Sequence, residues 1–483
     1  MFVPGYFNLN NAAELYSSDA ETYQKINAAL IDATLNFKRM LYLNLTGRNE
    51  WNTAFGKNGK SFFYPKADLS WVFTEAFKMP KWFSFGKVRA AYANTGIAPN
   101  PYTNKTYYGV PLFTDGYSNG NTLPYLGQAG LGQSTLLGNP NIKPERVSDM
   151  EGGFNLSFLN NRVTVDFTYY SEESKDLLIN EPIPASTGYT SMLSNAGKMT
   201  NKGIELAVGG DPIKTKNFDW NINVGWSQNK NKVTFLANGI NQFTYEVGFG
   251  GLSSEAVLGQ PYGVFYGSTW KRNGNGDLLL DANGLPQVSS TASVVGNPNP
   301  KWLMNINNTF TYKAWSFGFL WDIRQGGDMW NGTAQSLNTK GKSAATVDRN
   351  STYNISGVYD AGTPNAGQTH TTTLKGYDGS GQDYFTYMLG QNGADENAIQ
   401  SGGWVRLRSV SLSYRFDLTK KEKKYLFKFV ELGASGRNLY LHTKYTGVDP
   451  ETSLTGAGSN IKGFDYFNNP GTKSFFFSLK VGI

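Results

Sequence analysis

Apolar and polar residues alternate with a period of two along much of this chain. Residues 162–172, 217–229, 315–326 and 473–483 show the alternation most clearly. One side of each segment is apolar, and the other carries mainly Asn, Thr, Ser, Asp and Arg. A period of two is typical of β-strands whose two faces meet different surroundings. The pattern therefore predicts an all-β chain.

The length of the alternating segments indicates a membrane setting. Several run to about ten residues, the length that lets a tilted strand cross a bilayer. The pattern places strands near residues 25–37, 40–51, 62–75, 83–96, 148–158, 162–172, 200–212, 217–229, 302–313, 315–326, 403–416, 427–441 and 473–483. We expect a transmembrane antiparallel β-barrel, with the lipid bilayer as the partner of its apolar face.

The connections between these strands are alternately short and long, as in bacterial outer-membrane barrels with short periplasmic turns and long extracellular loops. We expect the long extracellular loops near residues 97–147, 173–199, 230–301, 327–402 and 442–472. A complete single-chain barrel of this kind has an even number of strands, and the segment Met1–Gly5 does not resemble a signal peptide. Residues 1–483 are therefore expected to be the C-terminal portion of a larger barrel.

Composition excludes several other classes of protein. Aromatic residues make up 14% of the chain and charged residues only 17%, which is unlike a disordered chain. The chain has no Cys and 2 His, so thiolate metal sites are excluded and nothing marks a catalytic centre. Basic residues are interleaved with acidic ones, so no nucleic-acid partner is indicated. We expect no enzymatic activity, no metal and no cofactor.

A series of short motifs resembles the C-terminal half of the SusC/RagA family of TonB-dependent transporters of the Bacteroidetes outer membrane. The motifs follow the family's order and cover nearly the whole chain. They lie at Met40–Trp51, Phe63–Phe73, Gly138–Glu145, Asn201–Glu205, Gly259–Gly267, Val295–Lys301, Trp404–Arg408, Arg437–Leu439 and Tyr445–Pro450.

The resemblance implies about 13 strands of a 22-stranded barrel, with the N-terminal strands and the plug absent from this sequence. It implies energised uptake of oligosaccharides or peptides through the bacterial outer membrane. The implied partners are a SusD-like surface lipoprotein acting as a lid, the N-terminal remainder of the barrel, and the TonB–ExbB–ExbD complex, reached through the missing plug region. The alternative is a passive porin-like barrel or a surface-binding module without TonB coupling.

Two groups of residues are candidates for contacts with substrate, lid or plug. Aromatic residues in the expected loops could stack on sugar rings or anchor the lipoprotein, or they could pack the loops against one another; they are Tyr102, Tyr107, Tyr108, Tyr117, Trp270, Trp330 and Tyr466. Charged residues on the polar faces could line a substrate path or hold the plug; they are Asp166, Glu205, Asp322, Arg324 and Arg406.

The stretch 275–284 is rich in Asp, Asn and Gly, as calcium loops are. No Glu follows at the position where such a loop ends, and these residue types also favour turns. Both a turn and a cation site remain open, with the turn favoured.

Overall fold

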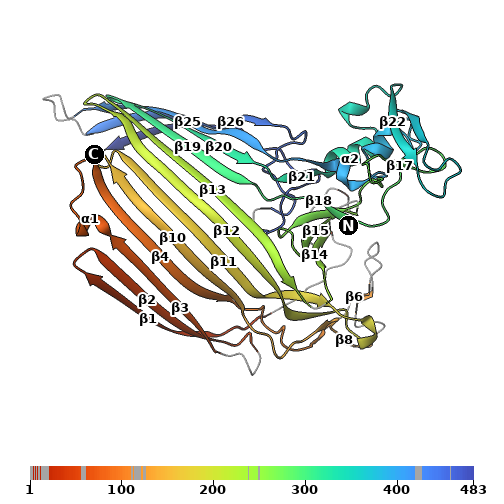
Figure 1. Cartoon of the computed structure of the whole chain (residues 1–483), viewed down its shortest axis with the longest axis horizontal. Coiled ribbons are helices and arrows are strands. Elements are labelled where there is room, and N and C mark those ends of the chain that lie inside the picture. The colour runs from red at the N-terminus through yellow and green to blue at the C-terminus, as the bar shows by residue number, and fades with distance from the viewer. Residues whose placement is uncertain are drawn as a thin grey trace.

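The computed structural model shows one large curved sheet with smaller folded segments gathered at one end of it (Figure 1). It describes residues 4, 6, 8, 11 and 21–482, apart from 56–60, 110–111, 114–120, 123–126, 238, 248–250, 419–426 and 457. Tyr117 lies outside the described residues.

The large sheet is antiparallel, and each of its strands pairs with the next long strand along the chain. The order is β1-β2-β3-β4-β10-β11-β12-β13-β19-β20-β25-β26-β28, with the short β9 (Leu136–Leu137) pairing beside β12. The bounds are Ile26–Phe37 (β1), Leu41–Asn52 (β2), Ser61–Val72 (β3), Phe83–Ile97 (β4), Glu145–Phe158 (β10), Val163–Pro182 (β11), Ser191–Lys214 (β12), Phe218–Leu236 (β13), Trp302–Tyr312 (β19), Trp315–Gln325 (β20), Trp404–Asp417 (β25), Phe429–Thr443 (β26) and Ser474–Gly482 (β28). The predicted all-β class and the predicted succession of strands are confirmed.

The register brings the apolar faces of neighbouring strands together. One row of directly paired residues is apolar on every strand from β1 to β25: Phe37, Leu41, Trp71, Val88, Phe154, Phe167, Leu206, Trp226, Met304, Ile323 and Val405. The row begins beside a short turn at β1 and ends on the loop side of β25, as expected when strands tilt and stagger in a barrel wall. We call the apolar face the outer face and the opposite one the inner face.

The short turns reverse the chain within a few residues. Between β1 and β2, Lys38 and Arg39 have φ values of 49° and 55°. Positive φ at both central residues gives a turn whose twist matches that of the strands it joins. These turns all lie at the end of the sheet opposite the long loops.

Several strand boundaries differ from the expectation. Strands β11, β12 and β13 extend beyond their predicted ends, so the loop expected at 173–199 shrinks to 183–190 and the one expected from 230 starts after Leu236. Register shifts near Lys175–Leu178 and at Lys198/Met199 interrupt the period of two, so alternation could not reveal these extensions. The strand expected over 62–75 ends at Val72, because Phe73–Ala76 forms a helical turn (α1).

The long loops have secondary structure of their own. Small sheets form from β14 (Gln242–Val247), β15 (Ser253–Val257), β16 (Val264–Gly267) and β18 (Ser293–Gly296); from β17 (Leu279–Leu280), β22 (Thr352–Tyr359) and β23 (Thr369–Lys375); and from β21 (Asp328–Asn331), β24 (Ile399–Ser401) and β27 (Phe464–Asp465). Helix α2 (Gly332–Thr339) begins at Asn331, whose side chain accepts a hydrogen bond from the Ala334 amide. Figure 1 shows β17, β21, β22 and α2 gathered beyond the same end of the large sheet.

No helix among the described residues is long and apolar enough to cross a membrane.

Replacing Leu206 by Arg tests the outer face. Leu206 lies in the apolar row, and a charge near the middle of the hydrocarbon layer costs about 2–4 kcal/mol. We expect L206R in the intact protein to lower the fraction that resists unfolding on heating in outer-membrane preparations. The neighbouring Ala207 faces inward, so A207R is the matched control. Equal losses for both variants would contradict the assignment of the two faces.

Candidate functional site

A cleft of about 980 Å³ lies between the inner face of β10–β13 and the loop segments that pack against them. We call it the inner cleft. Its walls come from the extended parts of β11, β12 and β13, and loop residues such as Tyr262, Asn299 and Lys462 close one side. The extensions that the alternation pattern missed therefore supply much of the aliphatic lining of this site.

A ladder of amide side chains crosses the wall of the inner cleft. The Asn201 amide donates to Glu172 (3.0 Å), and the Asn201 oxygen accepts from Asn229 (3.1 Å) and Asn231 (2.8 Å). Asn231 in turn accepts from the Tyr262 amide at 2.6 Å. The ladder connects three strands to a loop and presents amide groups to the cleft.

The upper wall of the inner cleft is aliphatic. Val233, Leu236 and Ala256 form a buried cluster against which Ile179 and Tyr262 pack. Burial raises the pKa of the Tyr262 hydroxyl, and the carboxylate of Glu145 adds to the effect. Tyr262 is therefore a neutral hydrogen-bonding group at ordinary pH. The cleft combines amide donors and acceptors with an apolar surface.

A second cleft of about 540 Å³ adjoins the first, because both are lined by Asn229, Asn231, Asn299 and Lys462. Glu205 and Tyr170 line its inner wall. The Asn201–Glu205 motif needs a glycine at position 203 because the Tyr170 ring occupies the space of a side chain there. Gly203 pairs with Tyr170, and a Cβ at this position would come within 2.4 Å of the Tyr170 ring. The motif thus places Asn201 and Glu205 inward with room for a tyrosine between them.

The chemistry available at these clefts is binding through hydrogen bonds, charge and apolar contact. Among the residues that the structure describes, no group of three His, Cys, Asp or Glu side chains could hold a metal ion. In the 275–284 stretch, Asp281 accepts hydrogen bonds from the amides of Asn283 and Leu285, which is turn geometry. Just before it, Asn273 accepts likewise from Asn275 and Asp277.

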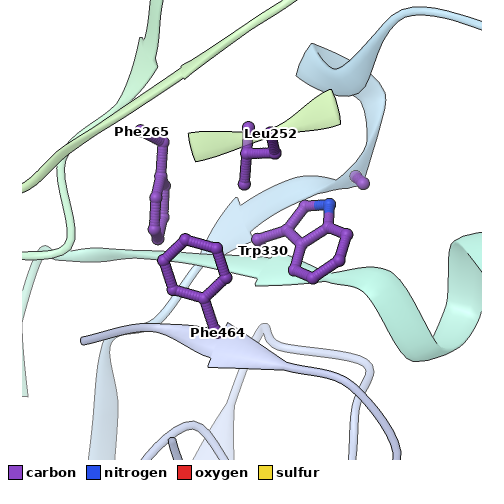
Figure 2. Close-up of a cluster of buried hydrophobic side chains, with 5 residues drawn as sticks. Leu252, Phe265, Trp330 and Phe464 are labelled. Carbon is purple, nitrogen blue, oxygen red and sulfur yellow. The ribbon is translucent and has the colours of Figure 1, made fainter. Parts of the chain in front are cut away.

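The two predicted loop tryptophans are buried, so they pack the loops against one another and do not offer ring faces to a ligand. Trp330 is 0% exposed and packs with Leu252, Phe265, Ala398 and Phe464 (Figure 2). Trp270 is 3% exposed and belongs to a second core with Leu285, Leu374, Met388 and Ala394. For these two residues, the substrate-contact interpretation is wrong.

The remaining described loop tyrosines are more accessible. Tyr108 is exposed, and Tyr102 and Tyr107 form an edge-to-face pair at 5.7 Å. Tyr466 stacks in parallel on Trp330 with its ring centroid 6.0 Å away. None of these tyrosines lines the two clefts described above.

The predicted inner-face charges occupy separate places. Asp166 accepts hydrogen bonds from Arg89 (2.8 Å) and from Asn155. Glu205 lines the second cleft, and Arg324 donates to the carbonyl of Pro298 at 2.6 Å. Asp322 and Arg406 are brought together with three residues that the sequence reading missed.

Those five residues form what we call the arginine cluster: Asp322, Arg406, Arg408, Asp449 and Glu451. Arg406 is only 3% exposed and pairs with Asp449 at 2.6 Å. Arg408 bridges Asp322 (2.6 Å) and Glu451 (2.8 Å). The cluster joins the motif Trp404–Arg408 on β25 to the motif that begins at Tyr445. It fixes the loop 444–472 to the barrel wall.

The loop 444–472 also contacts helix α2 and the buried core around Trp330. The Tyr445 hydroxyl donates to the buried Asp465 carboxylate at 2.6 Å, and Asp465 also accepts from Thr333 on α2 at 3.0 Å. Burial raises the pKa of Tyr445 above its usual range, and the bond to Asp465 raises it further. The loop 444–472 therefore connects the wall, helix α2 and the core around Trp330.

An apolar outer face, a polar inner face and folded loops at one end define a segment of an outer-membrane β-barrel. Residues 3–367 match the family described as TonB dependent receptor-like, beta-barrel, and the chain belongs to that family.

The relatives support the SusC/RagA resemblance. The chain is 27% identical to TonB-dependent receptor P26 of Formosa agariphila over 99% of this chain and 48% of that protein. It is 23% identical to TonB-dependent receptor SusC of Bacteroides thetaiotaomicron over 84% and 39%. The solved RagAB peptide transporter superposes with a TM-score of 0.70 at 18% identity, over 95% of this chain and 48% of the matched chain. The chain thus spans less than half the length of each of these relatives.

Replacing Arg406 by Met tests the arginine cluster. The change leaves Asp449 buried without its closest charged partner, which costs about 3–5 kcal/mol. We expect faster amide hydrogen exchange across residues 444–472 in the detergent-solubilised intact protein. R415M removes an exposed arginine at the other end of β25 and should leave that exchange unchanged. Unaltered exchange in R406M would refute the anchoring role.

The raised pKa of Tyr445 predicts an alkaline limit on loop stability. A pKa above the unfolded value of 10.0 means that this contribution is complete below pH 10 and is lost as the pH rises through the folded pKa. We expect the protection of amides in residues 444–472, measured as exchange relative to the intrinsic base-catalysed rate, to fall above about pH 10. Y445F should remove this pH dependence and weaken the loop by about 1–3 kcal/mol at neutral pH, because Asp465 loses a donor.

The exposed Tyr440 gives the control for this pH profile. Y440F should keep the wild-type response to alkali. An unchanged alkaline response in Y445F would show that another group is responsible.

Proposed function

We propose that this chain forms part of the wall and the large outer loops of a TonB-dependent nutrient importer of the SusC type. The observation that carries the proposal is the inner cleft, which lies on the polar face of the sheet and is partly closed by folded loops. A site in that place would bind a solute that has entered from the loop side. The task would be selective binding and gated passage without covalent chemistry.

The two open edges of the sheet support the proposal that this chain is part of a larger barrel. In the described part of the chain, β1 and β28 each pair with a single strand. In hydrocarbon an unpaired strand edge leaves backbone amides and carbonyls without partners. The remaining strands and the plug that couples to the TonB–ExbB–ExbD complex would come from the rest of a longer protein. The folded loops offer a platform for a SusD-like lipoprotein lid.

The lining of the inner cleft favours peptides over glycans. Its apolar surface is mainly aliphatic, from residues such as Leu177, Ile179 and Met199, whereas sugar rings usually stack on aromatic faces. The amide ladder matches the hydrogen-bonding groups of a peptide main chain. The RagAB structure is that of a peptide transporter, which agrees with this choice.

Uptake in the source bacterium tests the proposal. Cells carrying the intact protein should accumulate labelled oligopeptides, and deletion of the gene or of TonB should stop accumulation. Uptake that persists without TonB would favour the passive barrel. TonB-dependent uptake of labelled oligosaccharides alone would keep the importer and refute the peptide preference.

Replacing Glu205 by Trp tests the path of the substrate. Glu205 lies on the inner wall of the second cleft, and an indole there would fill part of the space. We expect E205W to reduce peptide uptake at least tenfold, while E205Q separates the effect of charge from that of size. I204W places the same indole on the outer face of the adjacent position and should transport normally. Normal transport by E205W would place the path elsewhere.

A further inference from the structure

The outer face of β10–β13 carries a group of basic side chains. They lie between the apolar residues of that face and the long loops. We call it the basic patch; it consists of Arg146, Lys175, Lys198, Lys202, Lys230 and Lys232. These residues alternate in step with the outward residues Met150, Tyr169, Ile204 and Trp226, and they occupy four adjacent strands. Five of them are exposed, and the Lys175 side chain is 43% exposed.

Several of these like charges lie directly opposite one another. Lys175 is the register partner of Arg146 on one side and of Lys198 on the other. Lys202 is the partner of Lys230. Like charges directly across a pair of strands destabilise a sheet. Each such pair costs a modest amount of stability, and a bound anion would offset this cost.

The chain supplies little of that neutralisation. Lys175 pairs with Glu173 at 2.9 Å, and Asp176 lies next to it. Among the residues that the structure describes, the other five basic side chains have no acidic partner within ion-pair distance. Lys198 instead lies over the ring of Phe235, 5.4 Å from its centroid. Four or more positive charges thus remain for an external anion.

The position of the basic patch relative to the apolar belt identifies the kind of anion. Lys202 is the next outward residue after Ile204, and Lys230 is separated from Trp226 only by Gln228 on that face. Two residues of strand span about 7 Å. The ammonium groups therefore lie at the level where the hydrocarbon ends and lipid headgroups begin. They lie on the long-loop side, which in bacterial outer-membrane barrels faces the cell exterior.

We propose that the basic patch binds the phosphate groups of a phosphorylated glycolipid in the outer leaflet of the membrane. Strands about 4.8 Å apart hold several ammonium groups close enough to grip one multiply charged headgroup. Its acyl chains would lie against Tyr169, Ile204 and Trp226. Arg146, Lys175, Lys202 and Lys232 line neither of the two clefts, whereas Lys198 lines the inner cleft and Lys230 the second cleft as well.

Lipid retention by the purified intact protein tests this site. The protein is extracted from its own outer membrane in mild detergent, and phosphorylated glycolipid per protein is measured by mass spectrometry. The triple variant K202Q/K230Q/K232Q should bind lipid A bisphosphate about a hundredfold more weakly, at roughly fivefold for each lysine lost near a charged surface. K202R/K230R/K232R should restore retention, and wild-type binding should weaken as salt is added.

The matched control changes three lysines at the short turns, K38Q/K216Q/K313Q, and should retain lipid like the wild type. Resistance to heat unfolding shows that each variant is folded. Equal binding of dephosphorylated lipid A would overturn the proposal, as would full retention by K202Q/K230Q/K232Q. Binding of inorganic phosphate as tight as that of lipid A would show a site for soluble anions. Capture of an acidic protein in place of lipid would show a protein-docking surface. Either result overturns the lipid assignment.

Discussion

The structure depends on one constraint: inside hydrocarbon, every backbone amide and carbonyl must find its hydrogen-bond partner within the protein. A sheet meets it only through unbroken pairing of neighbouring strands, and pairing fixes register. A slip by one residue would turn each apolar side chain inward. The apolar row from Phe37 to Val405 shows that the register and the side-chain pattern agree on every strand it crosses. Even the outward Asn308 has a partner, since the Trp220 indole donates to it at 3.0 Å.

Beyond the membrane the constraint changes, because water can satisfy backbone groups and the loops must gain stability from apolar burial. They do so with two buried apolar cores, around Trp330 and Trp270. The arginine cluster then fixes where this assembly sits on the wall. A buried ion pair adds little net stability compared with apolar packing, but removing one partner is costly. Arg406 and Asp449 therefore specify the position of the loop 444–472 more than they stabilise it. Since loop residues close the inner cleft, its shape depends on how the loops are held.

The sequence predicted the fold well because alternation reports directly on two-faced strands, and outer-membrane strands are long enough to show it. It fails where bulges break the period, which is why alternation predicts loop at the ends of β11, β12 and β13, and with them at much of the aliphatic lining of the inner cleft. It also failed for Trp270 and Trp330, since composition cannot tell a ring that packs a loop core from one that faces solvent. The partners Arg406 and Asp449 are 43 residues apart. Their two motifs were visible, but only the fold shows that they meet.

The asparagines of the amide ladder and several lysines of the basic patch follow one another directly in the chain. Residues 229–232 read Asn-Lys-Asn-Lys, and Asn201 precedes Lys202. Because successive side chains of a strand point to opposite faces, the asparagines enter the inner cleft, whereas Lys202 and Lys232 face the lipid boundary. A bound headgroup would hold the lysines of β12 and β13 in place, and the same backbone sets the spacing of Asn201, Asn229 and Asn231. Charge neutralisation outside would thereby stabilise the amide ladder inside. One short polar sequence, which composition alone would assign to a solvated loop, serves both faces of the barrel wall.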